Sequence, residues 1–203
     1  MTNTFSVELR SISGSNSHQY DIKLQKIRKR IINRLLCTKS ILEKANALNI
    51  VNILSPSIIK TIAEDEMLPE NIAETILKQF LKQIKTFSCF LDKYSVSWNY
   101  TPRAIYRKSR IYLHKVHKIA PVFNYKRARF NLRALNTFFH RIVVWPRIST
   151  QLALAIYITD KKDPLRKQKL KPGNIRAITH CSAYAFYQNK NILIDKGVLN
   201  PDE

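Results

Sequence analysis

The sequence predicts a mainly α-helical fold, with an N-terminal helical region followed by a basic helical domain that ends in a small C-terminal β-hairpin. Only three glycines occur among the 203 residues, which argues against barrels, sandwiches and glycine-rich phosphate loops. Long runs rich in Ile, Leu, Lys, Arg and Asn contain few turn residues, a pattern typical of helices. Hydrophobic residues make up 45% of the chain, enough to bury a core.

The first part of the chain predicts a mobile segment and one amphipathic helix. Residues 1–19 are polar and we expect them to be flexible, while Asp21 can cap the helix that follows. Its apolar residues recur at helical spacing: Leu24, Ile27, Ile31, Ile32, Leu35 and Leu36. The opposite face carries Lys23, Lys26, Arg30 and Arg34, and the pattern leaves open whether this face is solvated or binds a partner.

Two proline signals predict a helical hairpin from Ser55 to Tyr94. Ser55 is a cap followed by Pro56 at the first helical position, and Pro69 opens a second helix with acidic residues in its first turns. These helices complete the N-terminal helical region, residues 20–95, which could also bind a protein partner. A helix-turn-helix reader of DNA is an alternative use of this hairpin, although the acidic residues lie at the helix end that would face the bases.

A third cap-plus-proline signal, Thr101 and Pro102, predicts a helix to Ile119 inside a basic aromatic segment, residues 96–128. One face of this helix is apolar and carries Ile105, Tyr112, Val116 and Ile119. The other face carries a row of side chains at spacings of three and four, which we call the cationic rail: Arg103, Arg107, Arg110, His114 and Lys118. Pro121 ends this helix, and the next one begins within Lys126–Arg133 and is broken by Pro146.

The stretch from Lys93 to Thr159 contains thirteen Lys or Arg residues, many aromatic residues and no Asp or Glu. A solvated surface normally mixes both signs of charge, whereas phosphates attract cations and bases stack on rings. The whole chain has a formal net charge of +21 and a pI of about 10.1. We therefore expect nucleic acid as the partner. A basic surface that only aids solubility is one alternative. A membrane surface is disfavoured because the rail helix lacks a bulky apolar stripe.

The sequence predicts no enzyme, no cofactor, no metal and no membrane partner. The three cysteines lie far apart, and His114 and His117 have no Cys or acidic neighbour that would complete a metal site. The basic stretch offers no clustered carboxylates for metal-dependent hydrolysis. The longest apolar run is too short to cross a bilayer, and residues 1–19 lack the apolar core of a signal peptide, so we expect a cytoplasmic protein.

The C-terminal domain, residues 129–203, is expected to combine helices with a small hairpin. Residues 152–158 form either an apolar helix or a buried strand, and Asp163–Pro164 caps a very basic turn. The sequence pattern of residues 175–188 predicts the last helix. Residues 191–199, with the sequence NILIDKGVL, predict a short strand with a turn at Lys196 and Gly197.

Five short motifs follow one another in the last part of the chain. They are VVWPRIS (143–149), LALAIYITDKK (152–162), PLRKQKL (164–170), IRAITHCSAYA (175–185) and ILIDKG (192–197). In this order they resemble the RNA-binding domain of the FinO/ProQ family of bacterial RNA chaperones. The residues that match the motifs of that family are Lys169, Leu170, Arg176, Thr179, Tyr184 and Asp195. Pro172–Gly173 and an apolar residue near Leu193, in place of a hairpin Arg, depart from its pattern.

The resemblance implies an RNA chaperone, a post-transcriptional regulator that binds RNA hairpins with single-stranded 3′ tails. The chemistry agrees, because A-form duplex is recognised by backbone and shape, and unpaired tails by stacking. The expected RNA-binding residues are Arg166, Lys167, Lys169, Lys171, Arg176 and Tyr184, extended along the duplex by Arg103, Arg107, Arg110, Lys118, Lys126, Arg127, Arg129 and Arg133. Tyr184 could instead pack in the core with its hydroxyl at the rim.

RNA is favoured over DNA as the ligand, and two other functions stay open at this point. One is a helix-turn-helix-type DNA-binding regulator or plasmid replication protein. The other is a structural component of a ribonucleoprotein, of the ribosomal type, which would also be basic and aromatic.

Overall fold

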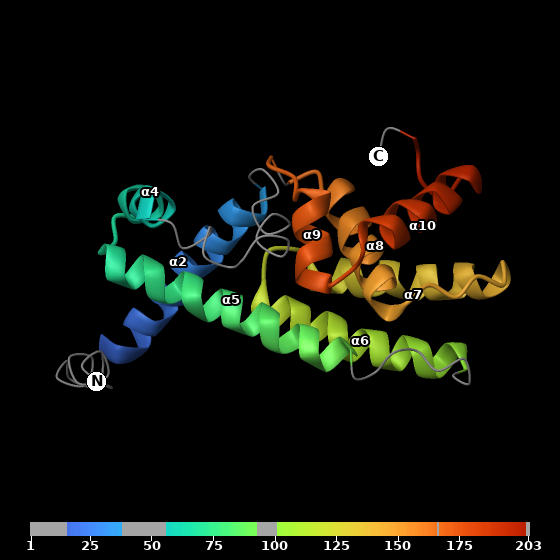
Figure 1. Ribbon diagram of the computed structural model, residues 1–203, viewed down its shortest axis with the longest axis horizontal. Coiled ribbons are helices and arrows are strands. Elements are labelled where there is room, and N and C mark those ends of the chain that lie inside the picture. The colour runs from blue at the N-terminus through green and yellow to red at the C-terminus, as the bar shows by residue number, and fades with distance from the viewer. Residues whose placement is uncertain (1–15, 38–55, 93–100, 166, 202–203) are drawn as a thin grey trace.

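The computed structural model describes residues 16–37, 56–92, 101–165 and 167–201, and these ranges contain eight helices and no strand (Figure 1). The helices are α2 (Asn16–Cys37), α4 (Pro56–Glu66), α5 (Glu70–Asp92), α6 (Pro102–Ile119), α7 (Tyr125–Arg141), α8 (Ile148–Lys161), α9 (Pro172–Thr179) and α10 (Ala183–Asp195). The prediction of a mainly α-helical protein is therefore confirmed, and the prediction of a small C-terminal β-hairpin is wrong.

Helix α8 is the centre of the C-terminal part of the molecule. Every residue from Thr150 to Asp160 is buried, and α6, α7, α9 and α10 all pack against this helix. A helix that is covered on all sides has no need for a polar face, which explains the continuous apolar run. Of the two interpretations of residues 152–158, the helix is confirmed. Among the described helices, none is both long and apolar enough to cross a membrane.

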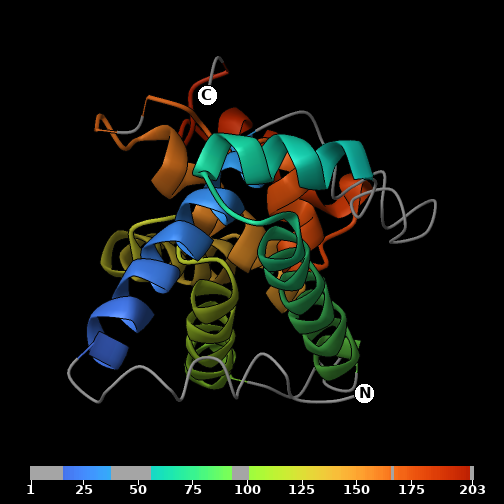
Figure 2. The same cartoon turned by 90° about the vertical axis from the view of Figure 1, so that its left-hand side faces the viewer.

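Helices α2, α4 and α5 form the other end of the molecule (Figure 2). The apolar stripe predicted for α2 lies in the core, with Ile31, Ile32, Leu35 and Leu36 almost completely covered. The helix starts at Asn16 rather than after Asp21, so residues 16–19 are helical and not a flexible lead. The predicted hairpin is present as α4 and α5, while its ends at Ser55 and residues 93–94 lie outside the described residues.

One continuous set of buried residues extends from α2 to α10. At the junction of the two ends of the molecule, the backbone N–H of Lys171 donates a 3.0 Å hydrogen bond to the carbonyl oxygen of Leu36. This bond connects the last turn of α2 to the start of α9. The first and last parts of the chain are therefore packed directly against each other.

Helix α6 begins where Thr101 and Pro102 predict, and α7 begins at Tyr125, just before the stretch Lys126–Arg133 in which its start was expected. Thr101 accepts a hydrogen bond from the Ala104 N–H through its hydroxyl, and Asn124 accepts one from the Arg127 N–H through its side-chain oxygen. The two helices are antiparallel, because Asn136 near the end of α7 donates to the Pro102 carbonyl at the start of α6. The apolar face predicted for α6 is buried at Ile105, Tyr112 and Val116 and partly buried at Ile119.

The last part of the chain corrects two predictions. The single helix expected at 175–188 is interrupted, because His180 adopts a left-handed backbone conformation and Ser182 then caps a new helix by accepting the Ala185 N–H. Helix α10 extends through residues 191–195, where a strand was expected. Its residues Phe186, Asn189 and Leu193 recur at helical spacing and are buried, which fixes this segment as a helix. The turn expected at Lys196 and Gly197 is present.

Candidate nucleic-acid interface

The antiparallel packing of α6 and α7 places two separate groups of cations side by side. Tyr106 of α6 lines one hollow together with Arg129 and Arg133 of α7. Arg103 and Arg110 lie one helical turn before and after Tyr106, so they share its side of α6. The cationic rail and the cluster at the start of α7 therefore border each other, although they are separated by a proline and two helix ends in the sequence.

We call this surface the basic face. All of its cationic side chains are exposed, as is His114. Its members are Arg103, Arg107, Arg110, His114 and Lys118 from α6, and Lys126, Arg129, Phe130 and Arg133 from α7. Because the stretch from Lys93 to Thr159 has no acidic residue, neither helix contributes a negative charge to this surface.

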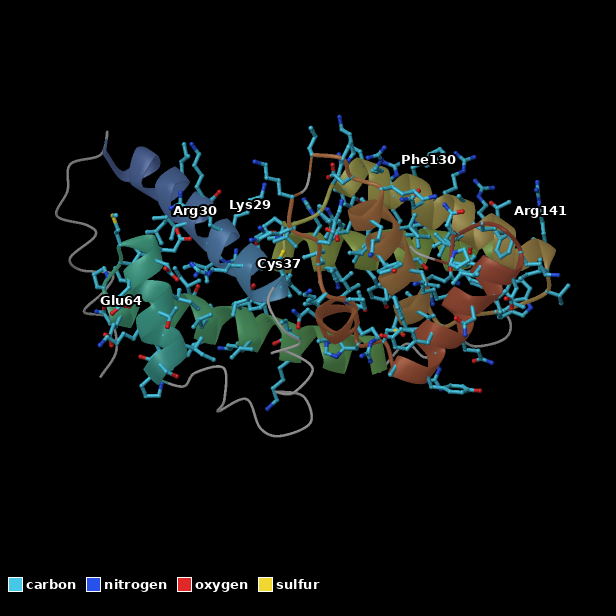
Figure 3. The ribbon with its side chains drawn as sticks, turned by 90° about the horizontal axis from the view of Figure 1, so that it is seen from above. Lys29, Arg30, Cys37, Glu64, Phe130 and Arg141 are labelled. Atoms are coloured by element: carbon cyan, nitrogen blue, oxygen red, sulfur yellow. The ribbon has the colours of Figure 1, made fainter. Side chains whose placement is uncertain are left out.

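The densest group of acidic residues, Glu64 to Glu66, lies on α4 at the other end of the molecule. Figure 3 shows Phe130 and Arg141 along α7, while Glu64 lies on α4, far from both. There, Arg30 of α2 binds Glu66 through a 2.8 Å ion pair and Arg34 binds Asp65. Part of the outer face of α2 therefore holds α4 in place, which gives these two cations a structural role.

The basic face contains one strongly exposed aromatic ring. Phe130 is 71% exposed, although the residues that α7 buries are Ala128, Leu132, Leu135 and Phe139. Its ring borders two shallow hollows of about 230 and 400 Å³. Phe130 was expected only as one of many aromatic residues of the basic stretch and not as a binding residue, although the register of the four buried residues places it on the outer face.

The two histidines of α6 lie against aromatic rings rather than against metal ligands. The ring of His117 packs 5.1 Å from the ring of Phe123 and 5.3 Å from that of Tyr125, measured between centroids. Burial, and then the charges of Lys29 and His114, lower the pKa of His117. Within the described ranges, no group of three or more His, Cys, Asp or Glu side chains is placed to hold a metal ion.

The C-terminal residues predicted to bind RNA differ in how far the structure exposes them. Lys167, Lys171 and Tyr184 are exposed, and Arg166 lies outside the described residues. Lys169 instead binds the carbonyl oxygens of Asp160 and Asp163 at 2.9 and 2.6 Å, so its ammonium group caps the end of α8.

Arg176 is only 8% exposed, and its guanidinium lies 5.7 Å from the ring centroid of Tyr187. By contrast Tyr184 is 76% exposed, so its ring is not part of the core. Arg127, at the start of α7, donates a hydrogen bond to the Lys162 carbonyl, which directs it toward the end of α8 and away from α6.

Helices α9 and α10 form a second arrangement that the sequence did not predict. The eight residues of α9 are followed by His180, Cys181 and Ser182, and then by the thirteen residues of α10. A turn of this length is the one that joins the two helices of a helix-turn-helix motif. Four side chains of α10 point to solvent and have no acidic neighbour before Asp195: Tyr184, Tyr187, Gln188 and Asn191.

Comparison with known protein families, characterised proteins and solved structures gave no match to this chain. The resemblance to the FinO/ProQ family therefore stays a prediction from the motifs of the last part of the chain.

Proposed function

We propose that this protein binds nucleic acid through the basic face, without catalysing a reaction. The observation that carries the proposal is the antiparallel packing of α6 and α7, which joins two groups of cations into one surface to which neither helix contributes an acidic residue. A polyanion with regularly spaced phosphates would gain from each cation and release its own counterions. The apolar face of α6 is buried in the protein, so it is not free to insert into a bilayer.

RNA is the first candidate ligand. Sequence-specific RNA recognition usually targets unpaired bases, which stack on aromatic rings and arginine planes. Phe130 with Arg129 and Arg133 offers both kinds of group on the basic face. The resemblance to RNA chaperones adds hairpins with 3′ tails as the expected RNA. The exposed residues Lys167, Lys171 and Tyr184 would extend the contact.

Duplex DNA is the second candidate, and the layout of α9 and α10 favours it. In a helix-turn-helix protein, the second helix enters the major groove and its first residues contact base edges. The exposed residues near the start of α10 are Tyr184, Tyr187 and Gln188. Helices α4 and α5 are also joined by a short turn, but α5 begins with Glu70 and Glu74. The start of α10 is therefore the better reader of DNA.

A competition assay at fixed, near-physiological salt tests these proposals. The ligands are an RNA hairpin with a U-rich 3′ tail, the same hairpin without the tail, and a DNA duplex of equal charge. We expect Arg129→Ala combined with Arg133→Ala to weaken binding to every ligand. The matched control, Lys60→Ala with Lys78→Ala, removes two cations that lie within reach of Glu64 and Glu74 and is expected to bind as wild type does.

The result separates the candidates. Preference for the tailed RNA supports the first candidate. Preference for the duplex, lost when Tyr184 and Gln188 are replaced by Ala, supports the second. Equal loss of binding in the basic-face and control variants would contradict the proposal. The affinity would then depend on the net charge of the protein and not on the position of the cations.

A further inference from the structure

Phe130 is exposed in a place where the fold has no use for an apolar ring. It lies on α7, two residues from Ala128 and Leu132, which are both fully buried, and its own side chain remains 71% exposed. Neighbouring positions on the same exposed side of the helix carry cations instead, among them Lys126 and Arg133. Burial of this ring in the core cannot account for its presence, since the helix turns it outward.

The surroundings of the ring have a specific composition. On one side, Phe130 shares a hollow of about 230 Å³ with Tyr106, Tyr125, Lys126, Arg129 and Arg133. On the other side, it shares a hollow of about 400 Å³ with Arg133, Ala134, Thr137, Phe138 and Arg141. Both hollows therefore combine aromatic and arginine side chains, and neither is lined by a carboxylate.

An apolar partner surface and a nucleic-acid base make different demands on such a site. A protein that docks on Phe130 would have to bring Arg129, Arg133 and Arg141 out of water or supply acidic partners for them. A nucleic-acid strand supplies phosphates to the arginines and a flat base to the ring in the same chain. The charge of the surroundings thus favours the strand.

We propose that Phe130 is a stacking platform for an unpaired base of the strand whose phosphates the basic face binds. This inference rests on the proposed function and adds to it that part of the ligand is single-stranded. A base in a duplex is stacked between its neighbours and has no face free for the ring, so the contact selects unpaired segments.

The test compares four full-length variants on two probes. The probes are a single-stranded oligonucleotide that contains the fluorescent base 2-aminopurine, and a duplex of the same length. The variants are Phe130→Ala, Phe130→Leu, Phe130→Trp and the control Met67→Ala, which removes an apolar side chain that is 94% exposed and lies between α4 and α5. Affinity, the salt dependence of affinity and quenching of the fluorescent base are measured for each.

We expect Phe130→Ala and Phe130→Leu to weaken single-strand binding by roughly tenfold, with less quenching and an unchanged salt dependence. Phe130→Trp and Met67→Ala should bind the single strand at least as well as wild type, and duplex affinity should stay within about twofold in every variant. Wild-type affinity in Phe130→Ala would overturn the inference. So would wild-type affinity in Phe130→Leu, because an apolar contact would then suffice.

Failure of the proposed function gives a different result. If Arg129→Ala with Arg133→Ala leaves single-strand and duplex binding unchanged, the basic face does not bind nucleic acid and both proposals fall. If that variant loses binding while Phe130→Ala does not, the basic face stands and only the stacking platform is overturned.

Discussion

The side-chain amide of Asn174, at the start of α9, donates a 2.9 Å hydrogen bond to the carbonyl oxygen of Leu36 in the last turn of α2. The same nitrogen lies 3.1 Å from the carbonyl oxygen of Leu35. The last carbonyl groups of a helix have no partner inside that helix, so an outside donor is needed where the helix end is buried. Asn174 supplies this donor and thereby holds the first described helix against the C-terminal part of the chain.

Replacing this amide should destabilise the whole protein. Asn174 is completely buried, so Asn174→Ala removes the donor from carbonyl groups that water does not easily reach. We expect the free energy of unfolding to fall by about 1–2 kcal/mol. Chemical denaturation measures the change, and Asn200→Ala, at an exposed position, is the control. Equal stability of Asn174→Ala and wild type would show that the contact does not join the two parts.

Removing the cationic rail should weaken binding to any nucleic acid. The variant with Arg103, Arg107 and Arg110 all replaced by Ala loses three exposed cations of α6, and the salt slope should flatten by up to about three units if all three contact phosphates. Binding is measured over a series of salt concentrations. The matched variant, with Lys60, Lys78 and Lys85 replaced by Ala, removes the same charge from α4 and α5. An equal change in the salt slope of both variants would show that the cationic rail has no special part in binding phosphates.

Replacing one residue just after the end of α7 should stabilise the protein. Val143 has a φ of 57°, a left-handed conformation that a β-branched residue adopts at a cost, and its side chain is 75% exposed. Asn adopts this conformation more easily, so Val143→Asn should raise the free energy of unfolding by about 1 kcal/mol. Thermal and chemical denaturation provide the measurement. A loss of stability would mean that the exposed valine side chain makes a contact that offsets its backbone strain.

His117 should make the fold sensitive to mild acid. Burial, followed by the charges of Lys29 and His114, lowers its pKa in the folded protein, so below the ordinary histidine pKa the unfolded chain binds a proton that the folded chain does not. Its stabilising contribution is present above that pKa and is lost as the pH falls toward the folded-state value.

The variant His117→Phe keeps an aromatic ring beside Phe123 and removes the titrating group. The free energy of unfolding is measured at about pH 7.5 and about pH 5.5. We expect the loss of stability between the two conditions to be smaller in the variant than in wild type. The same loss in both proteins would assign the acid sensitivity to other groups.

Three helix starts were predictable because each depends on a few adjacent residues that include a proline. Thr101–Pro102 marked the start of α6, and Pro56 and Pro69 marked the starts of α4 and α5. Two helix ends were not predictable for a related reason. Glycine normally provides the left-handed residue that ends a helix, but here His180 ends α9 and Val143 ends α7. The interruption at 180–182 was therefore missed, and with it the helix-turn-helix layout.

The error at residues 191–195 has a different origin. Asn-Ile-Leu-Ile-Asp is a short apolar run that fits a strand or a helix equally well, and local sequence cannot decide between them. Packing decides it, because Leu193 continues the buried row that begins at Phe186.

The candidate site shows the same division between local and tertiary information. The cationic rail and the cluster at the start of α7 were each visible in the sequence. Their junction through Tyr106 depends on antiparallel packing that only the fold provides. In contrast, Lys169 and Arg176 looked available for RNA but lie mostly inside the fold, because their hydrogen-bonding and stacking partners come from neighbouring helices and turns.

The most direct test of the account is photochemical crosslinking of the full chain to a radiolabelled nucleic acid, followed by mass spectrometry of the crosslinked peptides. We expect crosslinks in α6 and α7, concentrated at Phe130 of the basic face and at Tyr106 and Tyr125, which line a hollow together with it. Crosslinks confined to α2, α4 and α5, with none in α6 or α7, would contradict the claim that the basic face binds nucleic acid.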